Sequence, residues 1–196
     1  MVEKGALMGE SERGAATREH ILATATAMFG EAGYRGASLR DIAARCGLTH
    51  PGLLYHFPTK AGLLEAVLQR RDQDDTERAG TNERGLAALN ALVGVARKNS
   101  GTRGLVELFA TLSAEATAPD HPAHAYFVAR YERVVREITE HFVELVEDGE
   151  ARPGLDPQAA GRQWVALMDG LQIQWLLNPE TDMAAVLKAH LDAQLA

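Results

Sequence analysis

The sequence predicts an all-α protein of about nine helices. The strong helix formers alanine and leucine number 33 and 24 of the 196 residues, whereas the β-branched valine and isoleucine number only 12 and 4. Apolar residues recur at helical spacing in the segments between turn residues. The hydrophobic fraction of 46% excludes a disordered chain, and the single cysteine, Cys46, excludes an intrachain disulfide framework.

The N-terminal part contains a tail and a first helix. Residues 1–14 are polar, contain glycine and lack a period, so we expect a flexible tail. Over 17–32 the residues Ile21, Ala25 and Phe29 fall on one apolar stripe, which predicts a helix that ends at Gly33.

Two short helices follow, and each has its own start signal. Ser38 and Asp41 form a capping box, in which the hydroxyl accepts the third amide and the carboxylate accepts the cap amide. Gly47 stands where a left-handed residue closes that helix. Thr49 caps the next one, with Pro51 in its first turn.

The rest of the chain carries six further amphipathic segments. They are predicted from about residue 59 to 70 and over 86–96, 105–112, 127–146, 157–178 and 182–194. This pattern predicts a small domain over 15–60 and a larger helical domain over 61–196.

Charge is divided unevenly along the chain. The net charge is −7, yet residues 13–60 carry six basic side chains against three acidic ones, and residues 72–196 carry eleven against twenty. A basic end on an acidic body indicates a polyanionic partner, although chance explains the same counts. No apolar run approaches ~18 residues and no secretory signal is visible, so we expect a cytoplasmic protein with no membrane partner. Pro122 interrupts the His121–His124 pair and no cysteine supports it, so neither a metal site nor a cofactor is expected.

The two short helices around Gly47 fit a helix-turn-helix. In the second of them Leu53 and Phe57 lie on the inward side, so His50, Leu54 and Tyr55 lie on the outward side. A lone domain gains nothing from exposing these residues, whereas the major groove of DNA accepts one helix and presents base edges and thymine methyls to it. The alternative is a structural hairpin with stray surface aromatics.

Three segments together resemble the TetR family of transcriptional regulators. The segment TREHILATATAMFGEAGYRG (17–36) resembles the first helix and its Gly-Tyr turn. The segment SLRDIAARCGLTHPGLLYHFPTK (38–60) resembles the helix-turn-helix, and AGLLEAVL (61–68) resembles the linking helix. A later segment, MDGLQ (168–172), is similar to the dimerisation helix of the family.

The resemblance implies a dimeric, sequence-specific DNA-binding regulator. It implies a repressor that binds a palindromic operator on double-stranded DNA and is released by a small-molecule effector in the C-terminal domain. The implied DNA contacts are Ser38, Arg40, Thr49, His50, Pro51, Gly52, Leu54, Tyr55, His56 and Lys60. One position departs from the family pattern: Leu54 stands where a tyrosine is common, and the tyrosine comes one residue later. We expect Leu54 to contact a thymine methyl.

Large C-terminal side chains supply candidates for a ligand cavity and a dimer interface. The cavity candidates are Phe109, Phe127, Tyr131, Trp164, Met168 and Gln172. The interface candidates are Trp164, Leu167, Leu171, Trp175 and Leu187. Ordinary core packing explains each of these residues equally well.

Two other classes of function remain open from the sequence. One is a helical enzyme that turns over a small molecule in that cavity, and the other is an adaptor that binds only protein. Neither gives a reason for the outward side of residues 49–56, and we find no catalytic pattern, so no enzyme activity is expected.

Overall fold

A computed structural model of the chain describes residues 3–79 and 83–196. These residues form nine helices: α1 (Glu3–Gly36), α2 (Leu39–Arg45), α3 (His50–His56), α4 (Lys60–Ala79), α5 (Gly85–Asn99), α6 (Arg103–Glu115), α7 (His124–Glu147), α8 (Pro157–Leu177) and α9 (Met183–Asp192). Within those ranges the β-structure is limited to an isolated bridge between Ala151 and Leu195. The predicted all-α class is confirmed.

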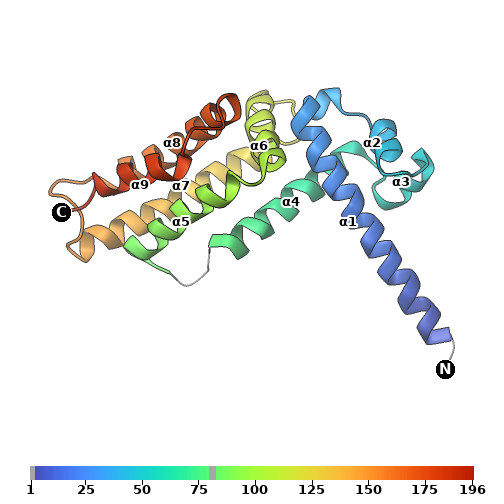
Figure 1. The fold of residues 1–196 in the computed structure, drawn as a ribbon, viewed down its shortest axis with the longest axis horizontal. Helices are drawn as coiled ribbons and strands as arrows, with labels where there is room; N and C mark the ends of the chain where they lie inside the picture. The colour runs from blue at the N-terminus through green and yellow to red at the C-terminus, as the bar shows by residue number, and fades with distance from the viewer. Residues whose placement is uncertain (1–2, 80–82) are drawn as a thin grey trace.

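The molecule consists of a head, α1 to α3, and a body, α4 to α9 (Figure 1). In Figure 1 the first turns of α1 project away from the body, and α4 runs from the head along the bundle of α5 to α9. No described helix is both long and apolar enough to cross a bilayer.

Helix α1 is longer than the sequence predicts. It begins at Glu3, so the expected flexible tail over 1–14 is wrong for residues 3–14, and residues 1–2 lie outside the described part. Alanine, glutamate and arginine have high helix propensity, and they extend α1 backwards from its packed half. The predicted break at Gly33 is present as a kink, with φ of +71° and ψ of 175°.

Two hydrophobic cores hold the fold. The first core joins the head to α4, to most of α6 and to the start of α7, and includes Phe29, Leu53, Leu63, Phe109 and Phe127. The second core joins α5, the end of α7, α8 and α9, and includes Leu89, Phe142, Trp164, Trp175 and Leu187. Tyr131 of α7 packs against both cores.

Helix α6 packs closely on the last part of α1. A Cβ at Gly30 would lie 3.0 Å from the backbone nitrogen of Leu108, so only glycine lets the two helices approach this far. The Thr111 hydroxyl donates to the Gly30 carbonyl at 3.2 Å. At the kink, the Tyr34 N–H donates to the Glu115 carboxylate at 2.7 Å. A Cβ at Gly33 would overlap that same carboxylate, which ties the kink to α6.

Candidate nucleic-acid interface and ligand cavity

The caps of α2 and α3 position the helix-turn-helix. Thr49 Oγ1 accepts the Gly52 N–H at 3.2 Å, which starts α3 as predicted. Gly47 has the expected positive φ of +69° between the two helices.

The cap of α2 differs in one bond from the predicted capping box. Ser38 Oγ accepts the Asp41 N–H at 3.1 Å, but the Asp41 carboxylate accepts the Ser38 hydroxyl at 2.6 Å. The prediction that it accepts the cap amide is therefore wrong. Aspartate is one methylene shorter than the glutamate usual at this position. Because the Ser38 hydroxyl hydrogen is directed at Asp41, it has to turn before it can donate to a phosphate.

Helix α3 has a buried side and an exposed side. Leu53 is fully buried and Phe57 is 3% exposed, as expected for the inward side. Tyr55 is 85% exposed, Pro51 is exposed, and His50, Leu54 and His56 are half-buried. A tyrosine this exposed gains little from the fold of its own chain, so the outer side of α3 is available to a partner.

Arg40 and Lys60 lie in different surroundings. Arg40 is exposed on α2 and forms no ion pair within the described part of the chain, whereas Arg45 on the same helix is held by Glu31 at 2.7 Å. Lys60, at the start of α4, places its Nζ 4.4 Å from the centre of the Tyr34 ring. Burial lowers the pKa of Lys60, and the nearby Glu115 carboxylate partly offsets this.

A cavity of about 680 Å³ lies between α4, α5, α6, α7 and α8. This volume is in the range of drug-sized ligand sites. Five of the six residues expected at a cavity lie on its wall: Phe109, Tyr131, Trp164, Met168 and Gln172. Phe127 does not, because it is buried in the first core, with its ring 5.7 Å from the ring of Phe109.

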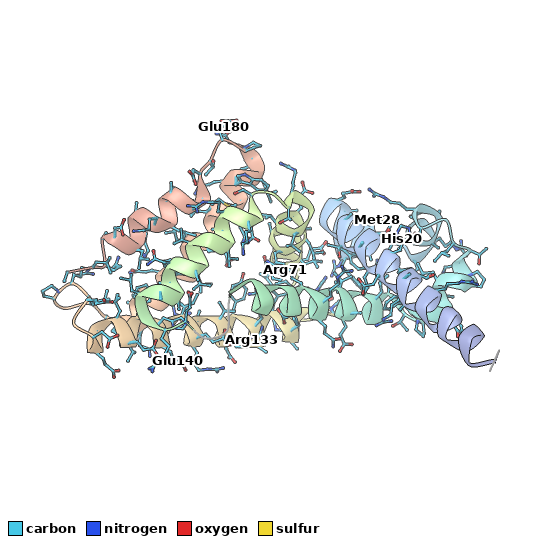
Figure 2. The ribbon with its side chains drawn as sticks, turned by 60° about the horizontal axis from the view of Figure 1, so that its bottom comes forward. His20, Met28, Arg71, Arg133, Glu140 and Glu180 are labelled. Carbon is cyan, nitrogen blue, oxygen red and sulfur yellow. The ribbon has the colours of Figure 1, made fainter. Side chains whose placement is uncertain are left out.

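The cavity also has a charged end that the sequence analysis missed. Arg71 of α4 and Arg130 of α7 lie over the Phe109 ring, with their guanidinium carbons 5.0 and 4.6 Å from its centre. Asp72 contacts Arg130 at 3.5 Å and Arg133 at 3.3 Å. Figure 2 shows Arg71 on α4 and Arg133 on α7 near the middle of the molecule.

The signal for these residues was weak in the sequence. Arg71 belongs to a polar run at the end of a predicted helix, which indicates solvent exposure, yet the structure leaves it only 6% exposed. Asp169 follows Met168 on the stripe of α8 that lines the cavity, and its carboxylate accepts the Tyr131 hydroxyl at 2.8 Å. Burial raises the pKa of Asp169, and burial beside that carboxylate raises the pKa of Tyr131 to about 12.

Four of the five expected interface residues lie inside the protomer. Trp164, Leu171, Trp175 and Leu187 are at most 6% exposed in the second core, and Leu167 is half-buried. Their spacing identified the inward stripes of α8 and α9, because periodicity alone does not separate a core stripe from an interface stripe.

The comparisons with known proteins agree with this architecture. The family model "Bacterial regulatory proteins, tetR family" matches residues 21–67, and the model "BetI-type transcriptional repressor, C-terminal" matches residues 86–196. A search of curated proteins found no match.

Solved structures of similar fold come from several bacteria. A TetR regulator of Streptomyces fradiae is 25% identical, with a TM-score of 0.69 over 94% of this chain and 88% of that one. SmeT of Stenotrophomonas maltophilia, solved with triclosan, is 22% identical, with a TM-score of 0.73 over 92% of each chain. A protein from Saccharomonospora viridis, solved with choline, is 23% identical, with a TM-score of 0.78 over 92% of this chain and 98% of that one.

Proposed function

The chain belongs to the TetR family of bacterial regulatory proteins, with a BetI-type C-terminal domain, and we propose that it represses transcription as a dimer that a small molecule releases from a palindromic operator. The observation that carries the proposal is helix α3, with its capped N-terminus and an outer side that exposes Tyr55. A helix of this kind fits the major groove, where its first residues reach base edges.

The proposed DNA contacts divide into two kinds. Ser38, Thr49, Tyr55, His56 and Lys60 are proposed to contact phosphates, which position the protein but carry no sequence information. The remaining contacts are proposed to reach base edges or to lead α3 into the groove, namely Arg40, His50, Pro51, Gly52 and Leu54.

The effector is proposed to occupy the cavity between α4 and α8. The related structures with triclosan and choline support a small organic molecule there. Two helices that line the cavity also hold the head: α4 continues from α3 through residues 57–60, and α6 holds the kink of α1 through Glu115. A ligand that moves either helix changes the position of α3. A coupling free energy of ~1–3 kcal/mol weakens DNA binding by about 5–150-fold, and DNA weakens ligand binding by the same factor.

We propose that dimers form through the outer sides of α8 and α9. Ile173 and Leu177 on α8 and Val186 on α9 are 52%, 83% and 42% exposed. Gly170 lies on the same helix, and a Cβ there would have no atom of its own chain within 4 Å. Because glycine weakens a helix by about 1 kcal/mol relative to alanine, Gly170 is better explained by the close approach of a second copy.

Selection from random-sequence DNA with the full chain tests the proposal. We expect a palindromic consensus whose half-sites lie about one helical turn, ~34–36 Å, apart or a little more. A protein adaptor or a helical enzyme would select no sequence. Sedimentation tests the dimer: Ile173→Glu should give monomers, whereas Val128→Glu, at a valine 46% exposed on α7, should not. A wild-type monomer at micromolar concentration contradicts the proposed dimer.

A further inference from the structure

The charged end of the cavity indicates the chemistry of the ligand. Arg71 is 6% exposed, although a charged side chain is rarely so buried without an anionic group nearby. Arg130 lies on the same Phe109 ring, so two guanidinium groups from two helices converge on one end of the cavity. Guanidinium groups bind carboxylates through two parallel hydrogen bonds.

The positions of these guanidinium groups disfavour a cationic ligand. An aromatic ring attracts a ligand cation through its face. The Phe109 ring, however, is already contacted by the chain's own Arg71 and Arg130, at 5.0 and 4.6 Å. A ligand cation at this ring would be repelled by two positive charges in a partly buried site, where such repulsion is screened little.

The carboxylates at the cavity wall do not reverse this preference. Asp72 lies within 3.5 Å of Arg130 and accepts the Tyr126 hydroxyl at 2.9 Å, so its charge is engaged by the chain itself. Asp169 accepts the Tyr131 hydroxyl, and burial works against its ionised form. Glu137 at the mouth is 54% exposed and lies 3.9 Å from Arg133.

The rest of the wall is apolar. The side chains away from the arginines are mostly aliphatic or aromatic and come from α5, α7 and α8: Leu92, Val95, Ile138, Trp164, Val165 and Met168. A ligand that fills the cavity therefore contacts charge at one end and hydrocarbon along its length.

Resting on the proposed function, we propose that the effector is an anionic amphiphile. Its carboxylate lies against Arg71 and Arg130, and its apolar body lies along α5, α7 and α8. This assignment names the ligand class of the cavity and separates it from cationic compounds of equal size.

Three probes with the same ten-carbon chain test the assignment on the full-length protein: decanoate, decanol and decyltrimethylammonium. Calorimetry and the fluorescence of Trp164 report binding below the micelle-forming concentrations. We expect decanoate to bind about 10-fold or more tightly than decanol, as for a hydrogen bond to a charged group, and the cation to bind most weakly. Decanoate should also release the selected DNA.

Variants identify the groups responsible. Arg130→Gln should weaken decanoate binding by about 10-fold and leave decanol within about twofold, and Arg130→Lys should restore part of the loss. Arg136→Gln, at an exposed arginine on the same helix but outside the cavity, should change neither. Where Arg130→Gln does not fold, the ranking of the three probes on the wild-type chain decides the question.

Decanoate binding no tighter than decanol, or tighter binding of the cation, overturns the assignment. DNA selection with the same preparation reports on the proposed function independently. A chain that selects an operator but does not prefer the anion keeps its DNA-binding function and loses this ligand class. A chain that prefers the anion but selects no DNA keeps the ligand class and loses the proposed function.

Discussion

The first and second cores differ in which parts of the chain they unite. The second core belongs to the body alone and contains both tryptophans, Trp164 and Trp175. The first core crosses from the head into the body, and it contains Leu108, Phe109 and Leu112 of α6 together with the helix-turn-helix. The cavity lies between the two cores, with Phe109 of the first and Trp164 of the second on its wall.

This difference shows that the head ends later in space than in sequence. A division at residue 60 follows the DNA-binding motif, yet α6 packs on α1 closely enough to require Gly30. A ligand between the cores therefore acts on the packing that joins the head to the body, and not only on the body. The predictions below test how separate the two cores are.

The largest effect is expected in the second core. Trp164 is 1% exposed, so Trp164→Ala should lower the free energy of unfolding by ~3–5 kcal/mol. Because α6 and α7 contribute to both cores, we expect one thermal transition that Leu63→Ala in the first core also shifts. Two separate transitions in calorimetry would show that the cores unfold independently.

The next effect concerns the kink that joins α1 to α6. Gly33→Ala adds a Cβ at positive φ that overlaps the Glu115 carboxylate, so we expect a loss of ~2–4 kcal/mol. Gly47→Ala is the matched control, since its φ of +69° is similar but no atom lies within 4 Å of the new Cβ. That variant should lose only ~1–2 kcal/mol in the same thermal denaturation. Equal losses would mean that the contact with Glu115 contributes nothing.

The third prediction separates two residues of the proposed DNA interface. Arg40→Ala should cost ~1–3 kcal/mol at one base pair and relax the preference there. Lys60→Ala should weaken binding to all DNA alike and lower the salt-dependence slope by about one per half-site. Affinities for operator and scrambled DNA at several salt concentrations measure both effects. The same slope and specificity in both variants would make Arg40 a phosphate contact, and wild-type binding by both would indicate a structural hairpin.

The smallest effect concerns the carboxylate that caps α5 in the body. Glu144 accepts the Gly85 N–H at 2.7 Å and the Arg84 guanidinium at 2.8 Å, and these bonds hold the pKa of Glu144 below its ordinary value of 4.5. A lowered pKa stabilises the folded state fully above the ordinary value, and the stabilisation is lost as pH falls through the lowered one.

Glu144→Gln should therefore lower stability by ~0.5 kcal/mol at pH 7, with the difference from wild type shrinking at acid pH. Urea denaturation from pH 7 to pH 3 measures it. A difference that stays constant across this range would mean that the charge of Glu144 has no part in the cap.

The sequence predicted the helices and the helix-turn-helix well because their signals are local. The cap at Thr49, the turn at Gly47 and the inward pair Leu53 and Phe57 are each set by neighbours within a few residues. The wall of the cavity was predicted only for its large apolar members, since a core stripe and a cavity stripe have the same period. Nothing local indicates that Arg71 is buried, because α7 and α6 bury it from far along the chain.

Helix α7 passes through both cores without a proline or glycine. Its 24 residues make a rod of ~36 Å at ~1.5 Å per residue. Phe127 near one end is fixed in the first core, Leu145 near the other is fixed in the second, and the cavity opens along the middle of the rod. Such a rod acts as a lever, since a tilt of ~5° about one end moves the other by ~3 Å. A ligand needs to tilt α7 only slightly to displace one core against the other by the width of an atom.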